Sequence, residues 1–259
     1  MTAKERQQEI IQMLGSGGGF VKMTEIVDRF SVSNETARRD LEALQDKGLV
    51  RRIYGGAVLL DSNHLRAQNT IAETIVRAHG QQEREAIGRL AATLIREGDT
   101  ILMSSGTTVQ QVAKNIKKLH TLTILTNSLA VINELSDTNF DIYVLGGKLD
   151  NNELNMSGDI TMKSLSGIFV DKAILGAGGV TLEYGVSDYG INDITVREEM
   201  VRHAGKTILV AQSSKFGKNA LSIGLPLDKI HTVVTDSGLA REYRTAFSDM
   251  GLNLLLADI

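Results

Sequence analysis

Between residue 81 and the C-terminus, apolar strand-like segments alternate with amphipathic helical segments, and this alternation limits the possible folds more than any other feature. The strand-like segments are almost continuously apolar, which is typical of parallel strands covered by helices on both faces. The sequence therefore predicts a mainly parallel α/β domain over 81–259. The expected strands are 99–105, 122–127, 140–147, 172–179, 206–214, 230–236 and 252–258, and the expected helices are 81–95, 107–116, 128–136, 195–204 and 241–250.

Several of the expected strands end in glycine, serine, threonine or asparagine. In an open α/β sheet the carboxyl ends of the strands share one edge, and ligands bind there. Caps and turns use the same residue types without any ligand, and for a single cluster this is the better interpretation. Several clusters on a common edge favour a pocket instead. They are Ser104 to Thr108, Asn127 and Ser128, Gly146 and Gly147, Gly176 to Gly179, and Ser213 to Lys215.

The segment from Ser105 to Thr108 joins an expected strand to an expected helix. Its backbone N–H groups and hydroxyls, aided by the helix dipole, suit an anion. Lys215 supplies a positive charge for the same group. These features predict a phosphate that carries hydroxyl groups, which means a sugar or polyol phosphate. A nucleoside triphosphate or a dinucleotide is not indicated, because the lysine of a phosphate-binding loop is missing and 176–179 is not followed by a helix.

Residues 1–58 have a different pattern, and 59–80 are expected to be a linker. Short helices are predicted over 4–14 and 23–30, and Ser33 caps a third helix that ends before Gly48. Two strands follow, joined at a glycine pair, which predicts a β-hairpin. Three short helices and a hairpin are the layout of a winged helix-turn-helix domain, which places its last helix in the major groove of DNA.

Two adjacent arginines lie near the start of the third helix. Ala37, Leu41 and Leu44 share one face of this helix, so Arg38 and Arg39 point away from the core. A helix start favours phosphate because of its free N–H groups and the helix dipole, and the arginines add positive charge there. A guanidinium there can also contact guanine in the major groove.

A second arginine pair, Arg51 and Arg52, lies at the base of the hairpin and is expected to hold phosphates. Gly55 and Gly56 are expected to form the hairpin tip and to let it approach the duplex. The full DNA-binding set predicted from the sequence is Ser33, Asn34, Thr36, Arg38, Arg39, Arg51, Arg52, Tyr54, Gly55 and Gly56.

An ordinary solvated surface is the alternative for these charges. Asp40 and Glu42 accompany the arginines, and residues 1–60 hold nine basic and eight acidic side chains. That balance differs from the strongly basic surface of many DNA-binding domains. The position of the arginines, rather than the total charge, therefore carries the prediction of DNA binding.

The run MTEIVDRFSVSNETARRDLEALQDKGLVRRIYGGAVL resembles the N-terminal signature of DeoR-family bacterial transcriptional regulators. GDTILMSSGTT, LTILTNSLAV, VLGGKL, VDKAILGAGGV and SSKFG resemble the effector domain of the same family, which is similar to ribose-5-phosphate isomerase. The family consists mostly of repressors released by phosphorylated sugar intermediates. The resemblance implies effector contacts at Ser105, Gly106, Thr107, Thr108, Asn127, Ser128, Gly147, Gly178 and Lys215, and Ser104 adjoins them in the expected site.

Two positions depart from the family pattern. Ser104 and Gln212 stand where the family usually has aspartate, before SGTT and before SSKFG. Each replacement removes an acid from the edge of the expected pocket. This favours a more anionic effector, or it indicates altered or lost effector control, and the sequence leaves both interpretations open.

An isomerase of this fold would need a carboxylate base beside the sugar carbon. The candidates are Asp171, Glu183, Asp188 and Glu198. Asp171 precedes an expected strand and so lies at the wrong end, whereas Glu183 and Asp188 are expected in a polar loop over the pocket. For these acids a solvated loop is a better interpretation than catalysis. The attached DNA-binding module makes ligand sensing the simpler prediction. We therefore expect a regulator of a carbohydrate or polyol operon, with an isomerase-like enzyme and a regulator without small-molecule control as the alternatives.

Composition limits the other possibilities. The chain has 259 residues, a formal net charge of −3, no cysteine and five scattered histidines, so neither a metal site nor a cofactor is expected. It lacks a long apolar run and a secretory signal, and we expect a cytoplasmic protein. Its expected partners are double-stranded operator DNA, a phosphorylated sugar or polyol, and further copies of itself. Because helix-turn-helix modules act in pairs, a dimer or tetramer is expected.

Overall fold

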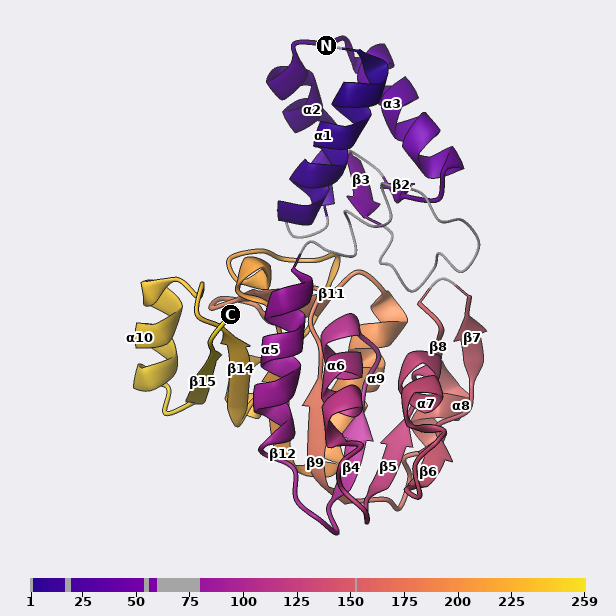
Figure 1. The fold of residues 1–259 in the computed structure, drawn as a ribbon, viewed down its shortest axis with the longest axis vertical. Helices are drawn as coiled ribbons and strands as arrows, with labels where there is room; N and C mark the ends of the chain where they lie inside the picture. The colour runs from indigo at the N-terminus through magenta and orange to yellow at the C-terminus, as the bar shows by residue number, and fades with distance from the viewer. Residues whose placement is uncertain (1, 17–19, 54–55, 60–79, 152) are drawn as a thin grey trace. The chain divides into compact units, whose positions relative to one another are not determined.

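The computed structural model describes residues 2–16, 20–53, 56–59, 80–151 and 153–259. The chain divides into two compact units, residues 1–81 and 82–259. Figure 1 shows the elements in chain order within each unit. Tyr54, Gly55 and almost all of the expected linker lie outside the described residues.

The described part of the first unit packs helices against a small antiparallel sheet (Figure 1). Its helices are α1 (Ala3–Ser16), α2 (Met23–Phe30) and α3 (Asn34–Asp46), and its strands, in spatial order, are β1 (Phe20–Lys22), β3 (Gly56–Leu59) and β2 (Val50–Ile53). Ile10, Leu14, Ile26 and Leu41 are fully buried between the helices. The expected helices and hairpin are therefore present, and β1 is an addition that the sequence did not predict.

The ends of α3 form as expected. The hydroxyl of Ser33 accepts a hydrogen bond from the N–H of Thr36 at 3.1 Å, which satisfies one free donor of the first turn. After the helix, Gly48 has a φ of 69°, a left-handed conformation that glycine adopts at little cost. Asp40 does not belong to a solvated charged surface, which was the alternative interpretation of the sequence. It is only 3% exposed and accepts hydrogen bonds from Arg6 and Gln7.

Gly56 does not lie at the hairpin tip, so that part of the prediction is wrong. It belongs to β3 and pairs with Ile53 of β2 and with Lys22 of β1. A Cβ at this position would lie 2.0 Å from the carbonyl oxygen of Val21. The close approach of β1 thus accounts for the glycine, and the expected contact of Gly56 with DNA stays a prediction.

The described part of the second unit is built on a seven-stranded parallel sheet in the order β15-β14-β12-β9-β4-β5-β6. The strands are β4 (Thr100–Met103), β5 (Thr123–Thr126), β6 (Asp141–Val144), β9 (Val170–Leu175), β12 (Ala204–Val210), β14 (Thr232–Asp236) and β15 (Asn253–Ala257). The chain runs from β4 outward to β6, returns to β9 beside β4, and then runs outward the other way. The strand order therefore reverses between β4 and β9, and such a switch point is where open α/β sheets bind ligands.

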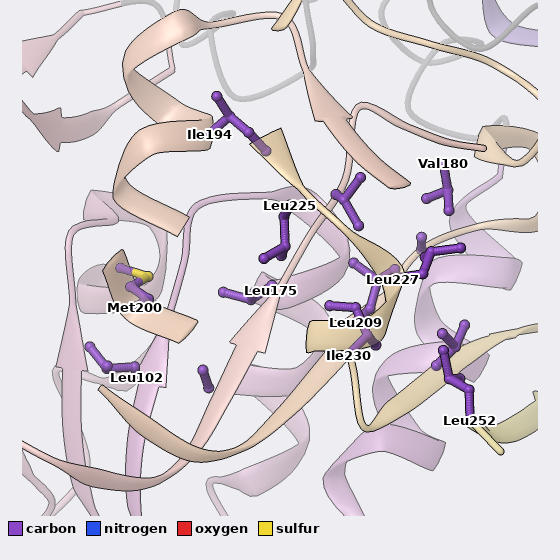
Figure 2. Close-up of a cluster of buried hydrophobic side chains, with 14 of the residues drawn as sticks. Leu102, Leu175, Val180, Ile194, Met200, Leu209, Leu225, Leu227, Ile230 and Leu252 are labelled. Carbon is purple, nitrogen blue, oxygen red and sulfur yellow. The ribbon is translucent and has the colours of Figure 1, made fainter. Parts of the chain in front are cut away.

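Alternate strand residues enter two separate hydrophobic cores. Ile101 and Met103 of β4 face one layer of helices, whereas Leu102 faces the other. Figure 2 shows the second core, where Leu209 of the sheet lies beside Leu227 and Ile230, and Leu102 lies beside Met200. One layer comprises α5 (Gln81–Ala92), α6 (Thr107–Ile116) and α7 (Leu129–Leu135), and the other comprises α9 (Ile191–Arg202) and α10 (Arg241–Asp249). The sheet is covered on both faces, as the continuous apolar strands predicted.

Smaller elements between these strands were not predicted. They are β7 (Lys148–Asp150), β8 (Asn155–Ser157), α8 (Asp159–Lys163), β10 (Gly179–Thr181), β11 (Gly185–Asp188), the short helix η2 (Ser213–Lys215) and β13 (Ser222–Leu225). The prediction of a solvated polar loop at Asp188 is wrong, because β11 is buried along its whole length. Its hydroxyl and carboxylate find partners inside the protein: Ser187 Oγ donates to the carbonyl of Gly179, and Asp188 pairs with Arg197.

Candidate functional site

The start of α3 presents the first group of expected functional residues. Ser33, Asn34, Arg38 and Arg39 are exposed there, and Thr36 is half-buried. Arg39 Nε lies 3.2 Å from Glu35 Oε1, and its side chain is 76% exposed. Exposed pairs of this kind contribute about 0.3–0.5 kcal/mol, so a phosphate or a base edge can replace the glutamate at little cost. The structure thus brings these residues together on one solvent-facing helix start.

Arg52 has a contact that the sequence did not predict. Its Nη1 lies 2.5 Å from Glu42 Oε1, and its backbone N–H donates to Gln45 Oε1 at 3.0 Å. Arg38 Nε lies 3.4 Å from the same Glu42 oxygen. Glu42 therefore links the hairpin to α3. The side chain of Arg51 lies outside the described residues, and its phosphate contact stays a prediction.

The start of α6 forms the second group, at the carboxyl end of β4. Gly106 precedes the helix with a φ of 142°, a conformation that strongly favours glycine, and it provides no capping side chain. The first N–H groups of a helix have no acceptor within the helix, so those of Thr107 and Thr108 can donate to a ligand at this sheet edge. A Cβ at Gly106 would lie 3.9 Å from the Cα of Gly176, which follows β9. The two chain segments at the switch point are therefore in close contact.

Other residues of the expected effector set have structural partners. Ser104 Oγ accepts from the N–H of Gly176 at 3.2 Å, and Ser128 Oγ accepts from Val131 at the start of α7. The N–H of Gly178 donates to the carbonyl of Ser187 at 2.9 Å. A Cβ at Gly147 would lie 2.1 Å from Thr161 Oγ1. At these positions, caps and close packing account for the residue type.

Lys215 follows β12 on the same sheet edge. Its Nζ lies 5.9 Å from the centre of the Tyr189 ring, within cation–π range. Asp236 is buried and accepts from the N–H of Ser213 at 2.7 Å, which fixes the short helix that carries Lys215. Burial lowers the pKa of Lys218, and the nearby charge of Lys215 lowers it further. The edge beyond β12 is therefore cationic.

Gln212 also lies on this edge, where the family pattern has an aspartate. Its Oε1 accepts a hydrogen bond from Arg84 Nη1 of α5 at 3.4 Å. The neutral amide keeps this contact with the guanidinium without adding a negative charge.

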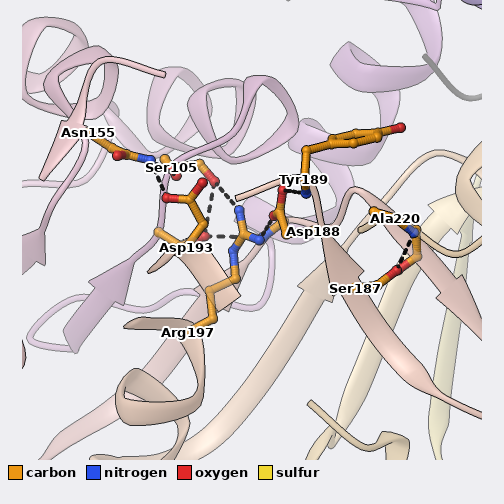
Figure 3. A network of polar contacts seen from close by, with 11 residues as sticks. Ser105, Asn155, Ser187, Asp188, Tyr189, Asp193, Arg197 and Ala220 are labelled. Carbon is orange, nitrogen blue, oxygen red and sulfur yellow. Dashed lines mark hydrogen bonds and ion pairs between the residues drawn. The ribbon is translucent and has the colours of Figure 1, made fainter. Parts of the chain in front are cut away.

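A buried polar network connects these segments beneath the edge (Figure 3). Arg197 of α9 forms an ion pair with Asp188, and its Nη2 lies 3.3 Å from the carbonyl oxygen of Ser105. Burial lowers the pKa of Arg197 to about 10, so the guanidinium stays charged near neutral pH. Asn155 Nδ2 donates to Ser105 Oγ and to Asp193 Oδ1, each at 2.9 Å. The network holds the segment before α6 from two sides.

Sequence reasoning missed Arg197, Asn155 and Asp193. Helical spacing places Arg197 among apolar positions of α9, beside Ile194 and Met200, and this was the available signal. Asn155 lies in a short strand without any pattern. Contacts between residues 50 and 92 positions apart bring both to Ser105, and no local pattern reports such contacts.

The acids considered for an isomerase do not meet at this edge. Asp171 lies near the amino end of β9, as expected, where it accepts from the N–H and hydroxyl of Thr100. Asp188 is committed to Arg197. Glu183 is exposed. Asp193 joins the network through Asn155, and its pKa is raised by burial and partly lowered again by Asn155.

A hollow of about 160 Å³ lies at the other edge of the sheet. It adjoins the amino ends of β5 and β6, so it is separate from the switch point. It is lined by Gly98, His120, Thr121, Leu122, Thr123, Asn139 and Asp141.

Two family models match the chain. One, described as a DeoR-like helix-turn-helix domain, matches residues 6–63, and the other, described as a DeoR C-terminal sensor domain, matches residues 79–237. The fold and these matches thus define a helix-turn-helix transcriptional regulator with a sensor domain. The chain belongs to the DeoR family.

Curated relatives agree with this assignment. The transcriptional repressor AccR of Agrobacterium fabrum is 32% identical over 92% of this chain and 91% of its own length. The HTH-type transcriptional repressor GlcR of Bacillus subtilis is 33% identical over 90% of this chain and 89% of its own. The expected regulator, rather than an enzyme, is confirmed by these relatives and by the family models.

Solved structures with a similar fold include ribose 5-phosphate isomerase A of Methanocaldococcus jannaschii, at 14% identity and a TM-score of 0.40, covering 53% of this chain and 55% of that one. Another is the tetrameric eIF2B-beta2-delta2 complex of C. thermophilum, at 13% identity and a TM-score of 0.48, covering 96% and 89%. The predicted fold class, a helix-turn-helix domain followed by a mainly parallel α/β domain, is confirmed by the family model and by the strand order of the second unit. Among the described residues, no helix is long and apolar enough to cross a membrane.

Proposed function

We propose that this chain represses an operon of carbohydrate or polyol metabolism and leaves its operator when a phosphorylated sugar or polyol binds the second unit. The observation that carries the proposal is the start of α6 at the switch point between β4 and β9. Backbone N–H groups at a helix start that have no acceptor within the helix, together with adjacent hydroxyls, suit a phosphate. The names of AccR and GlcR as repressors support the direction of regulation.

In this proposal Arg38 and Arg39 bind DNA from the start of α3. Their exposure supports this role. Their exposed ion pairs with Glu42 and Glu35 are weak, which also supports it. Ser33, Asn34 and Thr36 contact the DNA beside them from the same turn. The hairpin contacts the DNA backbone through Arg51, Arg52, Tyr54 and Gly55. There Arg52 leaves Glu42 and binds a phosphate instead.

The phosphate of the effector binds at Ser105, Gly106, Thr107 and Thr108, and the cationic edge at Lys215 attracts it. Neutral Ser104 and Gln212 suit this arrangement, because an aspartate at either position would repel the anion. The expectation of a more anionic effector, which follows from these two replacements, is thereby favoured over a loss of effector control.

The second unit also joins copies of the chain, so that two helix-turn-helix units bind two half-sites. Effector binding shifts the equilibrium between two arrangements of the subunits and misaligns the paired α3 helices. Coupling free energies of about 1–3 kcal/mol would weaken operator binding by roughly 5–150-fold.

The test uses the full chain and an operator selected from fragments of the host genome. A thermal-shift screen first ranks phosphorylated sugars and polyols, each paired with its unphosphorylated parent compound. The best phosphorylated compound should then release the operator in fluorescence anisotropy, whereas its parent compound should not. Release by the parent compound alone, or failure of every phosphorylated compound to bind, would contradict the proposal.

A further inference from the structure

Two buried side-chain oxygens beside the proposed phosphate site lack hydrogen-bond partners among the described residues. They are Oδ1 of Asn127 and Oδ1 of Asn155, on side chains of residues that are 2% and 1% exposed. Buried polar atoms are nearly always hydrogen-bonded, because an unmade bond leaves the full cost of desolvation. Two such oxygens on adjoining chain segments therefore suit a partner that arrives from outside the chain.

The orientation of both amides is fixed by their other contacts. Asn155 Nδ2 donates to Asp193 Oδ1 at 2.9 Å, and Asn127 Nδ2 donates to the carbonyl oxygen of Met156 at 2.8 Å. A backbone carbonyl and an ionised carboxylate can only accept, so each must face the NH₂ group of its amide. Turning either amide over would place oxygen against oxygen. The unpaired atoms are thus acceptors and not donors.

Both amides lie at the carboxyl edge of the sheet. Asn127 directly follows β5, and Asn155 begins β8, where it forms an isolated bridge with Ser128. Asn155 also donates to Ser105 Oγ, in the segment that leads into α6 (Figure 3). Asn155 therefore contacts the segment before α6, and Asn127 lies on the chain segment that adjoins Asn155.

The charges around these oxygens decide what can bind them. The Asp193 carboxylate disfavours a second anionic group, and the Arg197 guanidinium, which contacts the carbonyl oxygen of Ser105, disfavours a metal cation. Neutral hydrogen-bond donors remain. In a phosphorylated carbohydrate, the hydroxyl groups are such donors, at a distance from the phosphate.

We propose that Asn127, Asn155 and Asp193 form the hydroxyl-reading end of the effector site. The inference rests on the proposed function, since it assigns the part of the effector that extends beyond the phosphate. The effector is then a polyhydroxylated monophosphate, whose phosphate lies at the α6 start and whose hydroxyls donate to the two amide oxygens. Asn155 and Asp193 determine specificity for hydroxyl groups and do not attract the anion.

Isothermal titration of the full chain tests this assignment. The probes are inorganic phosphate, glycerol 3-phosphate, glucose 6-phosphate and sorbitol 6-phosphate. Asn155→Leu should weaken the best-bound hydroxylated probe by about three- to tenfold more than it weakens inorganic phosphate, because the lost contact with Ser105 Oγ affects both probes whereas the lost amide oxygen, worth one neutral hydrogen bond, affects only the hydroxylated probe. Asn253→Leu is the matched control, because its amide lies at the amino end of β15 and donates to Thr232.

A second variant protects the test against a folding defect. Asn155→Ser puts a smaller polar group at this position and also removes the amide oxygen, so it should show the same selective loss. Thermal unfolding of each variant identifies material that has not folded.

The possible failures are distinguishable. If no phosphorylated probe binds the wild-type chain, the proposed function fails and this inference fails with it. If the probes bind, and the folded Asn155 variants weaken inorganic phosphate as much as the hydroxylated probe, or weaken neither, the hydroxyl-reading role alone is overturned.

Discussion

Arg6 and Asp40 join the first helix of the DNA-binding unit to α3: Arg6 Nε lies 2.5 Å from Asp40 Oδ2. Gln7 Nε2 donates to the other carboxylate oxygen at 3.1 Å. Asp40 directly follows Arg39 in the sequence, yet it is buried while Arg39 is exposed. A buried carboxylate therefore fixes the rotation of α3, and with it the direction in which the arginine points.

Asp40→Ala should destabilise the first unit strongly. Removing one member of a buried ion pair leaves the other charge buried without a partner, at a cost of about 3–5 kcal/mol. We expect a lower denaturant midpoint for the loss of DNA binding by the full chain. Glu35→Ala is the control, because it breaks only the exposed pair with Arg39 and should cost less than about 1 kcal/mol. Equal midpoints for the two variants would contradict the structural role of Asp40.

Arg39→Ala should remove preference for the operator without changing stability. A bidentate contact to a base discriminates by about 1–3 kcal/mol, or roughly 5- to 150-fold, and the mutated side chain is exposed. Anisotropy titrations with operator and scrambled duplexes at one salt concentration measure the ratio. Arg202→Ala is a matched control, since Arg202 is an exposed arginine paired with Glu199 in the second unit. An operator preference that survives Arg39→Ala would remove α3 from the recognition surface.

Thr107→Asp should abolish release of the operator by the effector. The new carboxylate would stand at the first position of α6, where the proposed phosphate binds, and would repel it. Operator binding in the absence of effector should persist, because the residue belongs to the second unit. Anisotropy with increasing effector measures the response, and Thr245→Asp on α10 is the control. A full response by Thr107→Asp would mean that the phosphate binds elsewhere.

Asp193→Asn should change the pH dependence of stability. Burial raises the pKa of Asp193 above 3.8, so the folded chain holds the proton more tightly than the unfolded chain does. Stability then falls as pH rises through the interval between these two pKa values. The asparagine variant lacks this ionisation, so its free energy of unfolding relative to wild type should increase as the pH rises. The increase should begin near pH 4, about the pKa of an aspartate in the unfolded chain, and continue towards neutral pH.

Asp137→Asn should show the opposite slope. Lys117 lowers the pKa of Asp137, so that carboxylate stabilises the fold above its ordinary pKa and loses this contribution on acidification. Urea unfolding at several pH values measures both variants. A constant difference between Asp193→Asn and wild type across the interval would show that Asp193 is not perturbed by burial.

The sequence predicted the elements whose patterns are local. The helix expected over 107–116 coincides with α6, and each expected parallel strand is present within a few residues. The spacing of Ala37, Leu41 and Leu44 was enough to identify the buried face of α3. These elements were predictable because periodicity and caps lie within a few consecutive residues.

The remainder depended on distant partners. Ser187 and Asp188 look like loop residues, but hydrogen bonds and an ion pair within the protein allow them to form a buried strand. Gly56 looked like a turn residue, whereas β1, more than thirty positions earlier in the chain, determines its environment. The effector contacts implied by family resemblance stay predictions, and the caps at Ser104 and Ser128 show why residue type alone is insufficient there.

The tight contact of Gly56 with the carbonyl of Val21 has a consequence for how such regulators diverge. Selection for a folded three-stranded sheet would preserve this glycine even in a descendant that no longer binds a promoter. The exposed guanidinium of Arg39 has no comparable folding duty and would drift once that selection ended. Among descendants of this gene, the glycine would therefore mark shared ancestry, and the arginine would mark those that still control transcription.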